Sequence, residues 1–183
     1  MVQRRIREAL LPLVSSLYGP YLLAIGLVSP VIFGVAVWLT RAGMKRAAAA
    51  LAGGLVAAAI NIGWDALAFR MDWWRYVITT DAIAPLVMYV PVALVFGGAF
   101  GLIGWRIIRA TGWIGVAVFY STFVGLGVLR DHVIAARGDV FVWGPGGTPH
   151  VVDAIGYFTL ALSVQFTMQV LAGPPRSDTL RAA

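Results

Sequence analysis

The sequence predicts an all-α fold, a polytopic membrane helix bundle. Of its 183 residues, 60% are hydrophobic and only 12% are charged, which is more apolar side chain than a soluble chain of this size can bury. The apolar residues fall in windows of about 20, the length that a helix needs to cross the hydrocarbon core of a bilayer. These windows are expected to be helical because an open strand would leave unpaired backbone groups in lipid.

Five segments have the length and composition of membrane spans. They are residues 20–40, 47–69, 82–106, 111–130 and 152–172. Ahead of them, residues 1–19 place apolar side chains on one face and charges elsewhere, which favours an interfacial helix. The same segment is also compatible with half of a re-entrant crossing, so both five and six spans stay open. Residues 20–172 then form the bundle, and the polar residues 173–183 are expected to be a flexible tail.

The charges predict an orientation. One end of the bundle carries basic residues with a single acid, Asp178. Those basic residues are Arg41, Lys45, Arg46, Arg106, Arg109, Arg176 and Arg181. The long loops 70–81 and 131–152 balance arginines with aspartates, so the positive-inside tendency predicts that they are non-cytoplasmic. The N-terminal arginines conflict with this orientation in a five-span model, which keeps six spans open. No basic stripe that would follow a nucleic acid is present.

The two long loops carry charged and aromatic residues in the same order. Asp65, Arg70, Asp72, Trp74, Tyr76 and Asp81 correspond to Asp131, Arg137, Asp139, Phe141, Trp143 and Asp153 when two gaps are allowed. The match predicts an internal repeat, with units at about residues 47–106 and 111–172. Because each unit crosses the membrane twice, the repeats are parallel and both loops emerge at one end of the bundle.

Asp65 directly follows the second apolar segment and is the first candidate for catalysis. Asn61 lies one turn earlier on the same helical face, which places an amide near the carboxyl group. One interpretation is a helix-end charge in water that pairs with Arg70. The other is a carboxyl group in a dry, aromatic pocket, kept protonated as a general acid. Acids inside a membrane cost about 2.5–3.5 kcal/mol at its centre and tend to mark function.

Asp153 is the second candidate acid because it opens the last predicted span and has Tyr157 one turn further along. Its alternative role is helix capping, worth about 0.3–1 kcal/mol. Asp81, for which capping is preferred, and Asp131 are secondary candidates. The side chains expected to line a pocket with these acids are Asn61, Trp64, Trp73, Trp74, Tyr76, Tyr89, Tyr120 and Tyr157. Tyr120 shares a face with Asp131, although aromatic stripes at this spacing are more often core packing.

Two motifs resemble known membrane cyclases. The stretch Asn61-Ile62-Gly63-Trp64-Asp65 resembles the N-x-x-W-acid signature of the small transmembrane terpene cyclases of fungal meroterpenoid pathways. Asp153-x-x-x-Tyr157 resembles the acid and tyrosine of their final helix. The order Trp64-Asp65, Trp73-Trp74 and Tyr76 is also similar to the repeated unit of the membrane-bound lycopene cyclase domains.

The likeness covers roughly residues 55–165. The meroterpenoid cyclases usually have Glu where this chain has Asp65, and commonly about seven spans. The Pro-x-Glu-Glu element of the lycopene cyclase domains is replaced by Pro91-Val92-Ala93. The resemblance therefore implies an acid role for Asp65 and a second acid, or hydrogen-bonding partner, at Asp153, without the lycopene-specific activity.

The function implied is that of a terpene cyclase of the proton-initiated type, in the isomerase or lyase class. In such an enzyme an acid protonates an epoxide or terminal alkene of a polyprenyl chain, and the carbocation closes rings where water is excluded. Aromatic faces stabilise the cation by about 0.5–2 kcal/mol each. The expected partners are an isoprenoid substrate and membrane lipids, and this chemistry requires no metal or redox cofactor.

Two other functions stay open. A metal-dependent membrane hydrolase would use Asp131, His132, His150 and Asp153, although their spacing matches no standard metal site. A small transporter or lipid-ligand binder would use the pairs Arg70/Asp72 and Arg137/Asp139 of the two loops as a gate. The chain has no Cys, which excludes disulfides, thiolate nucleophiles and cysteine metal sites.

Overall fold

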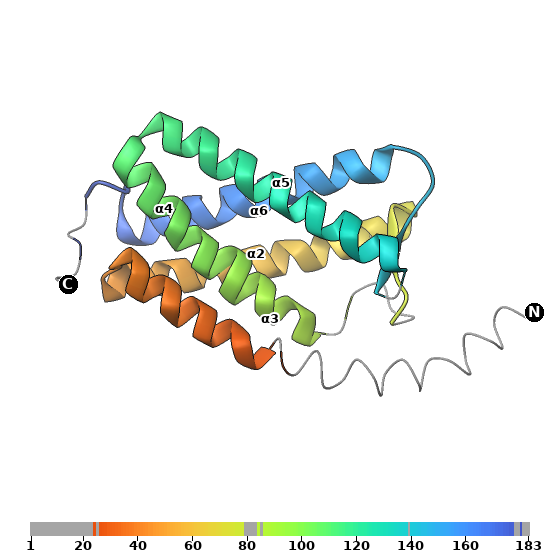
Figure 1. The fold of residues 1–183 in the computed structure, drawn as a ribbon, viewed down its shortest axis with the longest axis horizontal. Coiled ribbons are helices and arrows are strands. Elements are labelled where there is room, and N and C mark those ends of the chain that lie inside the picture. The colour runs from red at the N-terminus through yellow and green to blue at the C-terminus, as the bar shows by residue number, and fades with distance from the viewer. Residues whose placement is uncertain are drawn as a thin grey trace, which may run out of the picture.

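The computed structural model describes residues 24, 26–78, 84, 86–138, 140–177 and 180. The predicted N-terminal helix at residues 1–19 and the candidate Asp81 lie outside these residues. Within them the chain forms a bundle of long helices with a short two-stranded ribbon at one end (Figure 1). The predicted all-α bundle is confirmed.

The elements follow one another along the chain in the order expected from the apolar segments. They are α2 (Met44–Met71), β1 (Trp74–Tyr76), η1 (Leu86–Met88), α3 (Tyr89–Pro91), η2 (Val92–Ala99), α4 (Phe100–Thr111), α5 (Trp113–Arg137), β2 (Phe141–Trp143) and α6 (Thr148–Ala172). The segments η1, α3, η2 and α4 join into one helix, Leu86–Thr111. In the described part of the chain, this helix, α2, α5 and α6 are the 4 that are long and apolar enough to cross a membrane. The described part of the predicted first span is a shorter apolar helix, Gly26–Thr40.

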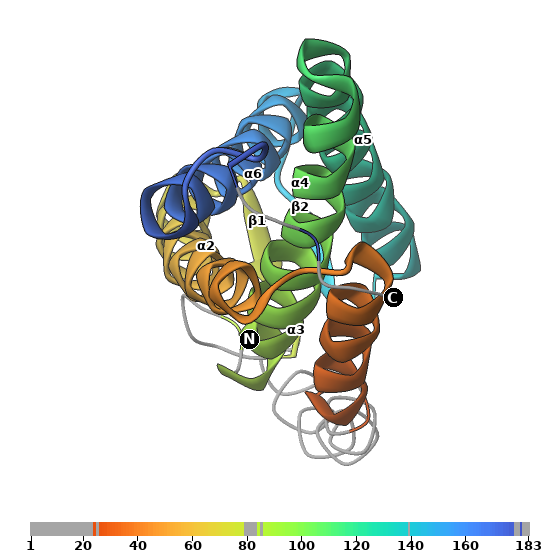
Figure 2. The ribbon, with the colours of Figure 1, turned by 90° about the vertical axis from the view of Figure 1, so that its left-hand side faces the viewer.

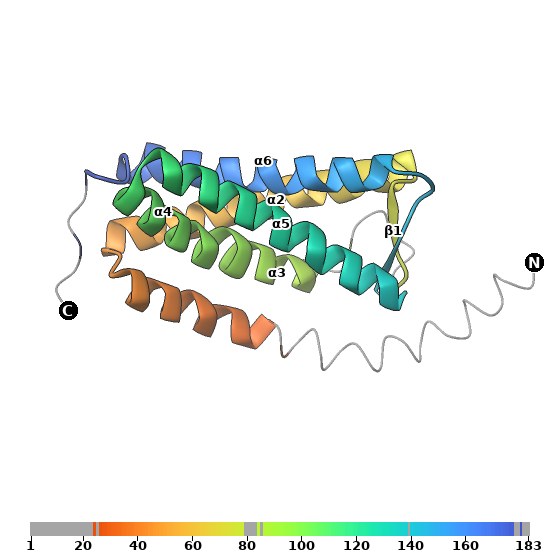
Figure 3. The same cartoon turned by 45° about the horizontal axis from the view of Figure 1, so that its top comes forward.

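The helices enclose an apolar core that is rich in small side chains. Figure 2 shows α2 and α6 on one side of the bundle and α4 and α5 on the other, and the helix Gly26–Thr40 lies on the outside, next to α3 (Figure 3). Trp105, Leu102 and Met168 are fully buried in this core. Many of the remaining core residues are alanines, which let helices approach closely. Large apolar side chains are exposed on the outer faces, such as Trp113 and Leu27, as expected of helices that face lipid.

Glycines bring α2 and η2 into backbone contact. A Cβ atom built on Gly54 would overlap the carbonyl oxygen of Ala93, and one built on Gly97 would overlap the Cα of Gly54. The segment η2 is a π-helix that begins directly after Pro91, whose ring nitrogen has no hydrogen to donate. Such segments occur in short pieces and often near functional sites.

Two helix boundaries differ from the sequence prediction, and both differences move candidate residues. The helix α5 continues to Arg137 and ends at Gly138, which has a φ of +68°, so Asp131 lies on a helix and not in a loop. Nothing in residues 131–137 breaks a helix before this glycine. The helix α6 begins at Thr148, with Pro149 at a position that suits proline. Asp153 therefore lies beyond the first turn, and the capping explanation for it is wrong.

The two predicted repeat loops meet at one end of the bundle. The strands β1 and β2 pair in antiparallel orientation, with Trp74 opposite Trp143 and Tyr76 opposite Phe141. Each strand is buried at its first residue and exposed at its second. This ribbon lies where α2 and α5 end and α6 begins (Figure 1), so the predicted meeting of both loops is confirmed.

At the opposite end a buried arginine closes the bundle. Arg46 is only 1% exposed, although its position predicts an anchor at the membrane surface, and its guanidinium stacks over Trp105 at 5.2 Å. It donates hydrogen bonds to the main-chain carbonyls of Met168, Ala172, Gly173 and Pro174. A cation at the C-terminus of α6 complements the helix dipole. Arg109 in turn donates to the carbonyl of Pro175, so the described start of the predicted flexible tail is tied to the bundle.

Candidate functional site

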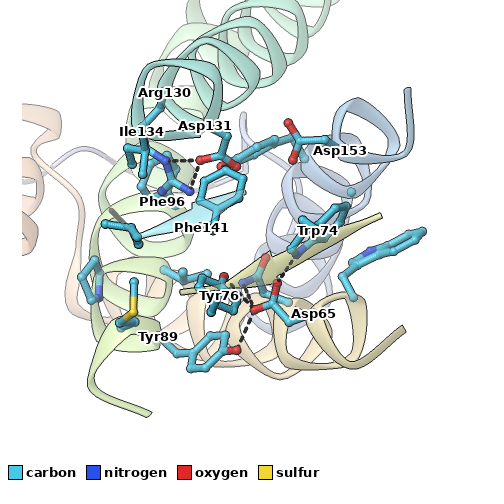
Figure 4. Close-up of a pocket in the computed structure, with 18 of the residues that line it drawn as sticks. Asp65, Trp74, Tyr76, Tyr89, Phe96, Arg130, Asp131, Ile134, Phe141 and Asp153 are labelled. Atoms are coloured by element: carbon cyan, nitrogen blue, oxygen red, sulfur yellow. Dashed lines mark hydrogen bonds and ion pairs between the residues drawn. The ribbon is translucent and has the colours of Figure 1, made fainter. Parts of the chain in front are cut away.

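A cavity of about 700 Å³ opens among the long helices beside the ribbon. Eight aromatic side chains line it, together with three carboxyl groups, two guanidinium groups and several aliphatic side chains (Figure 4). The aromatic residues of the wall are Trp64, Trp74, Tyr76, Tyr89, Phe96, Phe141, Trp143 and Tyr157. The charged or acidic ones are Asp65, Asp131, Asp153, Arg130 and Arg137. All four membrane-length helices therefore contribute to one chamber.

Asp65 is buried and surrounded by neutral donors. It is 4% exposed, and its Oδ2 accepts a hydrogen bond of 2.6 Å from the hydroxyl group of Tyr89. The same oxygen accepts from Tyr76 at 3.2 Å and from the Asn61 amide at 3.4 Å, while the Trp74 indole donates to Oδ1 at 3.0 Å. Arg70 is exposed at the end of α2, so the interpretation of Asp65 as a solvent charge paired with Arg70 is wrong.

The direction of these hydrogen bonds shows which form of Asp65 they favour. An indole N–H can only donate, and the Tyr89 oxygen accepts from the main-chain N–H of Ala84 at 3.2 Å, which leaves its O–H for Asp65. Burial and the charge of Asp65 raise the pKa of Tyr76 well above its usual value, so Tyr76 keeps its proton. Donors that converge on a carboxyl group stabilise its charged form. These donors can hold a charged Asp65, whereas its burial opposes the charge.

Asp131, which lies on α5, has a different set of partners. Its Oδ1 accepts from Arg130 Nε at 2.7 Å and lies 2.6 Å from Arg130 Nη2. Its Oδ2 accepts from the Tyr157 hydroxyl at 2.8 Å. The guanidinium of Arg130 also lies over the rings of Phe96, at 4.7 Å, and Tyr157, at 5.7 Å. Asp131 is thus an anion held by a cation, whereas Asp65 has neutral donors.

Asp153 has no such shell. The residue is 7% exposed, and its Oδ2 is buried with no hydrogen-bond partner among the described residues. The carboxyl group of Asp131 faces it across the cavity (Figure 4). Tyr157 lies one turn further along α6 than Asp153, but its hydroxyl group donates to Asp131 on α5.

Most of the predicted pocket residues lie together, and two do not. Asn61, Trp64, Trp74, Tyr76, Tyr89 and Tyr157 line the cavity with Asp65, Asp131 and Asp153. Trp73 packs against the cluster of Ala68, Trp74 and Phe141. Tyr120 packs on Phe119 and Phe158, in agreement with the core-packing alternative. Neither lines the cavity.

Several residues of the cavity wall carry no sequence signal for that position. Phe96 and Leu160 come from continuous apolar runs, in which no pattern separates a wall from a core. Arg130 ends the predicted span 111–130, and in the sequence its charge indicates only a balance with the loop aspartates. Phe141 and Trp143 were noticed as repeat counterparts of Trp74 and Tyr76, and that correspondence was the signal that could have placed them at the site.

The residues of the hydrolase interpretation do not form a ligand set. The His132 ring stacks on His150, with centroids 4.6 Å apart, and His132 Nδ1 contacts the carbonyl of Val128 at 2.8 Å. Trp143 packs against the other side of this pair. Within the described part of the chain, no three His, Asp or Glu side chains come together as a metal-binding group.

The gate pairs of the transporter interpretation are also rearranged. Asp72 pairs with Arg75 at 2.8 Å, and both side chains are more than half exposed, so this ion pair lies at the surface. Arg137 lines the cavity, whereas Asp139 lies outside the described residues.

Comparisons with protein-family models, curated proteins and solved structures found no match to this chain.

Proposed function

We propose that the protein is a membrane-embedded terpene cyclase that protonates a polyprenyl chain and guides its ring closure. The observation that carries the proposal is the cavity of about 700 Å³, which has eight aromatic side chains in its wall and one buried carboxyl oxygen with no hydrogen-bond donor among the described residues. A chamber of this size and lining suits an apolar ligand held by a few polar groups. The resemblance of the Asn61–Asp65 and Asp153–Tyr157 motifs to those of transmembrane cyclases supports the same function.

Asp153 is the proton donor in this proposal. A buried carboxylate without donors costs several kcal/mol, so the neutral acid is the favoured form. The acid gives its proton to an alkene carbon or an epoxide oxygen of the substrate. The π electrons form the new C–H bond, or the epoxide C–O bond breaks, and a carbocation remains. Attack by the next double bond closes a ring and moves the cation along the chain.

In this proposal Asp65 is a carboxylate that stabilises the carbocation and accepts the final proton. Its shell of neutral donors holds a carboxylate in place, and Trp74, Tyr76 and Tyr89 surround it with aromatic rings. Loss of a proton from the final cation to Asp65 regenerates a double bond. The product then has the same mass as the substrate, and the two carboxyl groups return to their starting states by proton exchange with water.

The membrane supplies both the substrate and the dry surroundings in this proposal. An isoprenoid dissolved in the bilayer reaches the cavity from the lipid phase, and the aromatic wall keeps water from quenching the cation. We place the ribbon end of the bundle on the non-cytoplasmic side, since Arg41, Lys45 and Arg106 lie at the other end.

A second function, the binding or transport of an apolar ligand, is favoured by one observation. The Arg130 cation already lies over Phe96 and Tyr157, and these are ring faces that a carbocation would otherwise use. A cavity with that arrangement can hold a ligand without changing it. Recovery of every bound isoprenoid unchanged would favour this function.

The test is an assay of purified protein in lipid nanodiscs. Polyprenyl compounds with a terminal alkene or a terminal epoxide are incubated with the protein, and the extract is analysed by gas chromatography and mass spectrometry. We expect a cyclic isomer of unchanged mass, and one deuterium per alkene-derived product when the reaction runs in D₂O. Asp72→Asn is the matched control, because Asp72 is a surface aspartate outside the cavity. The absence of any isomer across the panel would reject the proposed reaction.

A further inference from the structure

The Asp131 carboxylate is fixed on both of its oxygens. Arg130 holds Oδ1 through two nitrogens, at 2.7 Å and 2.6 Å, and Tyr157 holds Oδ2 at 2.8 Å. Arg130 cannot lose its proton in a protein, and its stacking on Phe96 limits its movement. Asp131 is 8% exposed. These contacts keep Asp131 charged and hold it in one orientation.

Asp153 adds a second carboxyl group to the same network. It comes from the neighbouring helix α6, and its carboxyl group faces that of Asp131 in the cavity (Figure 4). Its buried Oδ2 has no partner among the described residues. Two buried carboxyl groups that face each other repel when both are charged, and one proton between them removes that repulsion. Arg130 already selects Asp131 as the charged member.

We propose that Asp131 and Asp153 share a single proton and that Asp131 is the positioning residue that holds it toward the cavity. The proton is carried by Asp153 and hydrogen-bonded to the Asp131 carboxylate, with Arg130 and Tyr157 as the outer supports. The catalytic use of this proton rests on the proposed cyclisation. The sharing itself does not, and it is measured without a substrate.

Infrared difference spectroscopy tests the pair directly. Purified wild-type protein and variants are compared in nanodiscs at neutral pH, in H₂O and in D₂O, in the region of the protonated carboxyl C=O stretch. We expect a band that moves in D₂O, disappears in Asp153→Asn and stays in place in Asp72→Asn. In Asp131→Asn the band should be displaced or lost, because its acceptor is no longer charged. Turnover in Asp131→Asn should fall about 10²-fold, as expected when a reacting group is misplaced.

Tyr157→Phe is the second variant, since it keeps the packed ring and removes only the donor to Asp131. We expect a smaller displacement of the same band. A band that persists in Asp153→Asn, or one that neither Asp131→Asn nor Tyr157→Phe moves, would overturn the shared proton. If the band behaves as expected while no substrate is cyclised, the shared proton of Asp131 and Asp153 is supported and the proposed cyclisation is rejected. If substrate is cyclised and the band is absent, the cyclisation is supported and the shared proton is rejected.

Discussion

The two halves of the bundle place an aspartate at corresponding positions and give it opposite partners. Asp65 and Asp131 both lie near the end of the first helix of their repeat, and each accepts a hydrogen bond from a tyrosine of the second helix, Tyr89 or Tyr157. Asp65 then takes neutral donors, whereas Asp131 takes the cation Arg130. The repeat therefore determines where a carboxyl group lies, and its neighbours determine what that group can do.

The difference extends to the third carboxyl group. On the second half, Asp153 faces Asp131 (Figure 4), so a second carboxyl group lies near the one that Arg130 holds. On the first half, the counterpart Asp81 lies outside the described residues, and Asp65 is surrounded by Asn61, Trp74 and tyrosines. In the proposed reaction this makes the α5–α6 side the proton donor and the α2–β1 side the acceptor.

The change with the largest expected effect is Asp153→Asn. A general acid contributes roughly 10²–10⁴-fold to a rate, and the amide cannot donate a proton to an alkene or an epoxide. Turnover of an accepted polyprenyl substrate should fall by that factor, as measured by product mass spectrometry in nanodiscs. Asp72→Asn should retain the wild-type rate. Full turnover in Asp153→Asn would show that the acid lies elsewhere.

Carbodiimide labelling distinguishes the two halves without a substrate. Dicyclohexylcarbodiimide is apolar and reacts with protonated carboxyl groups. Asp153, as a neutral acid on the cavity wall, should be modified, and Asp65, held as an anion by its donors, should be spared. Peptide mass spectrometry after labelling identifies the modified residue. Labelling of Asp65 in preference to Asp153 would reverse the assignment of donor and acceptor.

The variant Asp65→Asn should have a smaller effect on rate and a visible effect on product. Initiation at Asp153 remains, but the negative pole and the final proton acceptor are lost. We expect turnover to fall by about 10²-fold or less, with a larger share of hydroxylated or differently placed double-bond products in the chromatogram. An unchanged product pattern at a reduced rate would show that Asp65 supports the fold and takes no part in termination.

Periodicity and composition predict the fold well, because the forces that determine it are strong and local. Apolar windows of about 20 residues predict the segments that form α2, α4, α5 and α6. The matching order of residues in the two loops predicts that β1 and β2 lie at the same end of the bundle. The boundaries were harder to predict. The end of α5 depends on Gly138 and the start of α6 on Pro149, whereas the prediction followed the loss of hydropathy at Asp131.

The sequence predicts most of the residues that line the candidate site, but not the hydrogen bonds between them. Asp65 and its neighbour Asn61 share a helix face, so their contact follows from spacing, and the structure contains it. The contacts between helices do not follow from spacing. Tyr157 donates to Asp131 and not to Asp153 on its own helix, and Trp64 donates to Thr159 across the bundle. Such choices depend on how the helices are rotated against each other, and one sequence does not contain that information.

The two tyrosines give the finest comparison between the halves. Hydrogen bonds to charged groups contribute about 1.5–3 kcal/mol, so Tyr89→Phe and Tyr157→Phe should each lower the thermal unfolding temperature in detergent. We expect the larger loss for Tyr89→Phe, because that change also leaves the Ala84 N–H without its acceptor and Asp65 without its shortest donor. Asp131 keeps Arg130 after Tyr157→Phe, so its charge stays compensated. The surface pair Asp72–Arg75 supplies the control, since exposed ion pairs contribute about 0–1 kcal/mol. An equal loss in both tyrosine variants would mean that Arg130 stabilises the Asp131 carboxylate no better than the neutral donors stabilise Asp65. The two halves would then differ in their proposed roles in the reaction and not in stability.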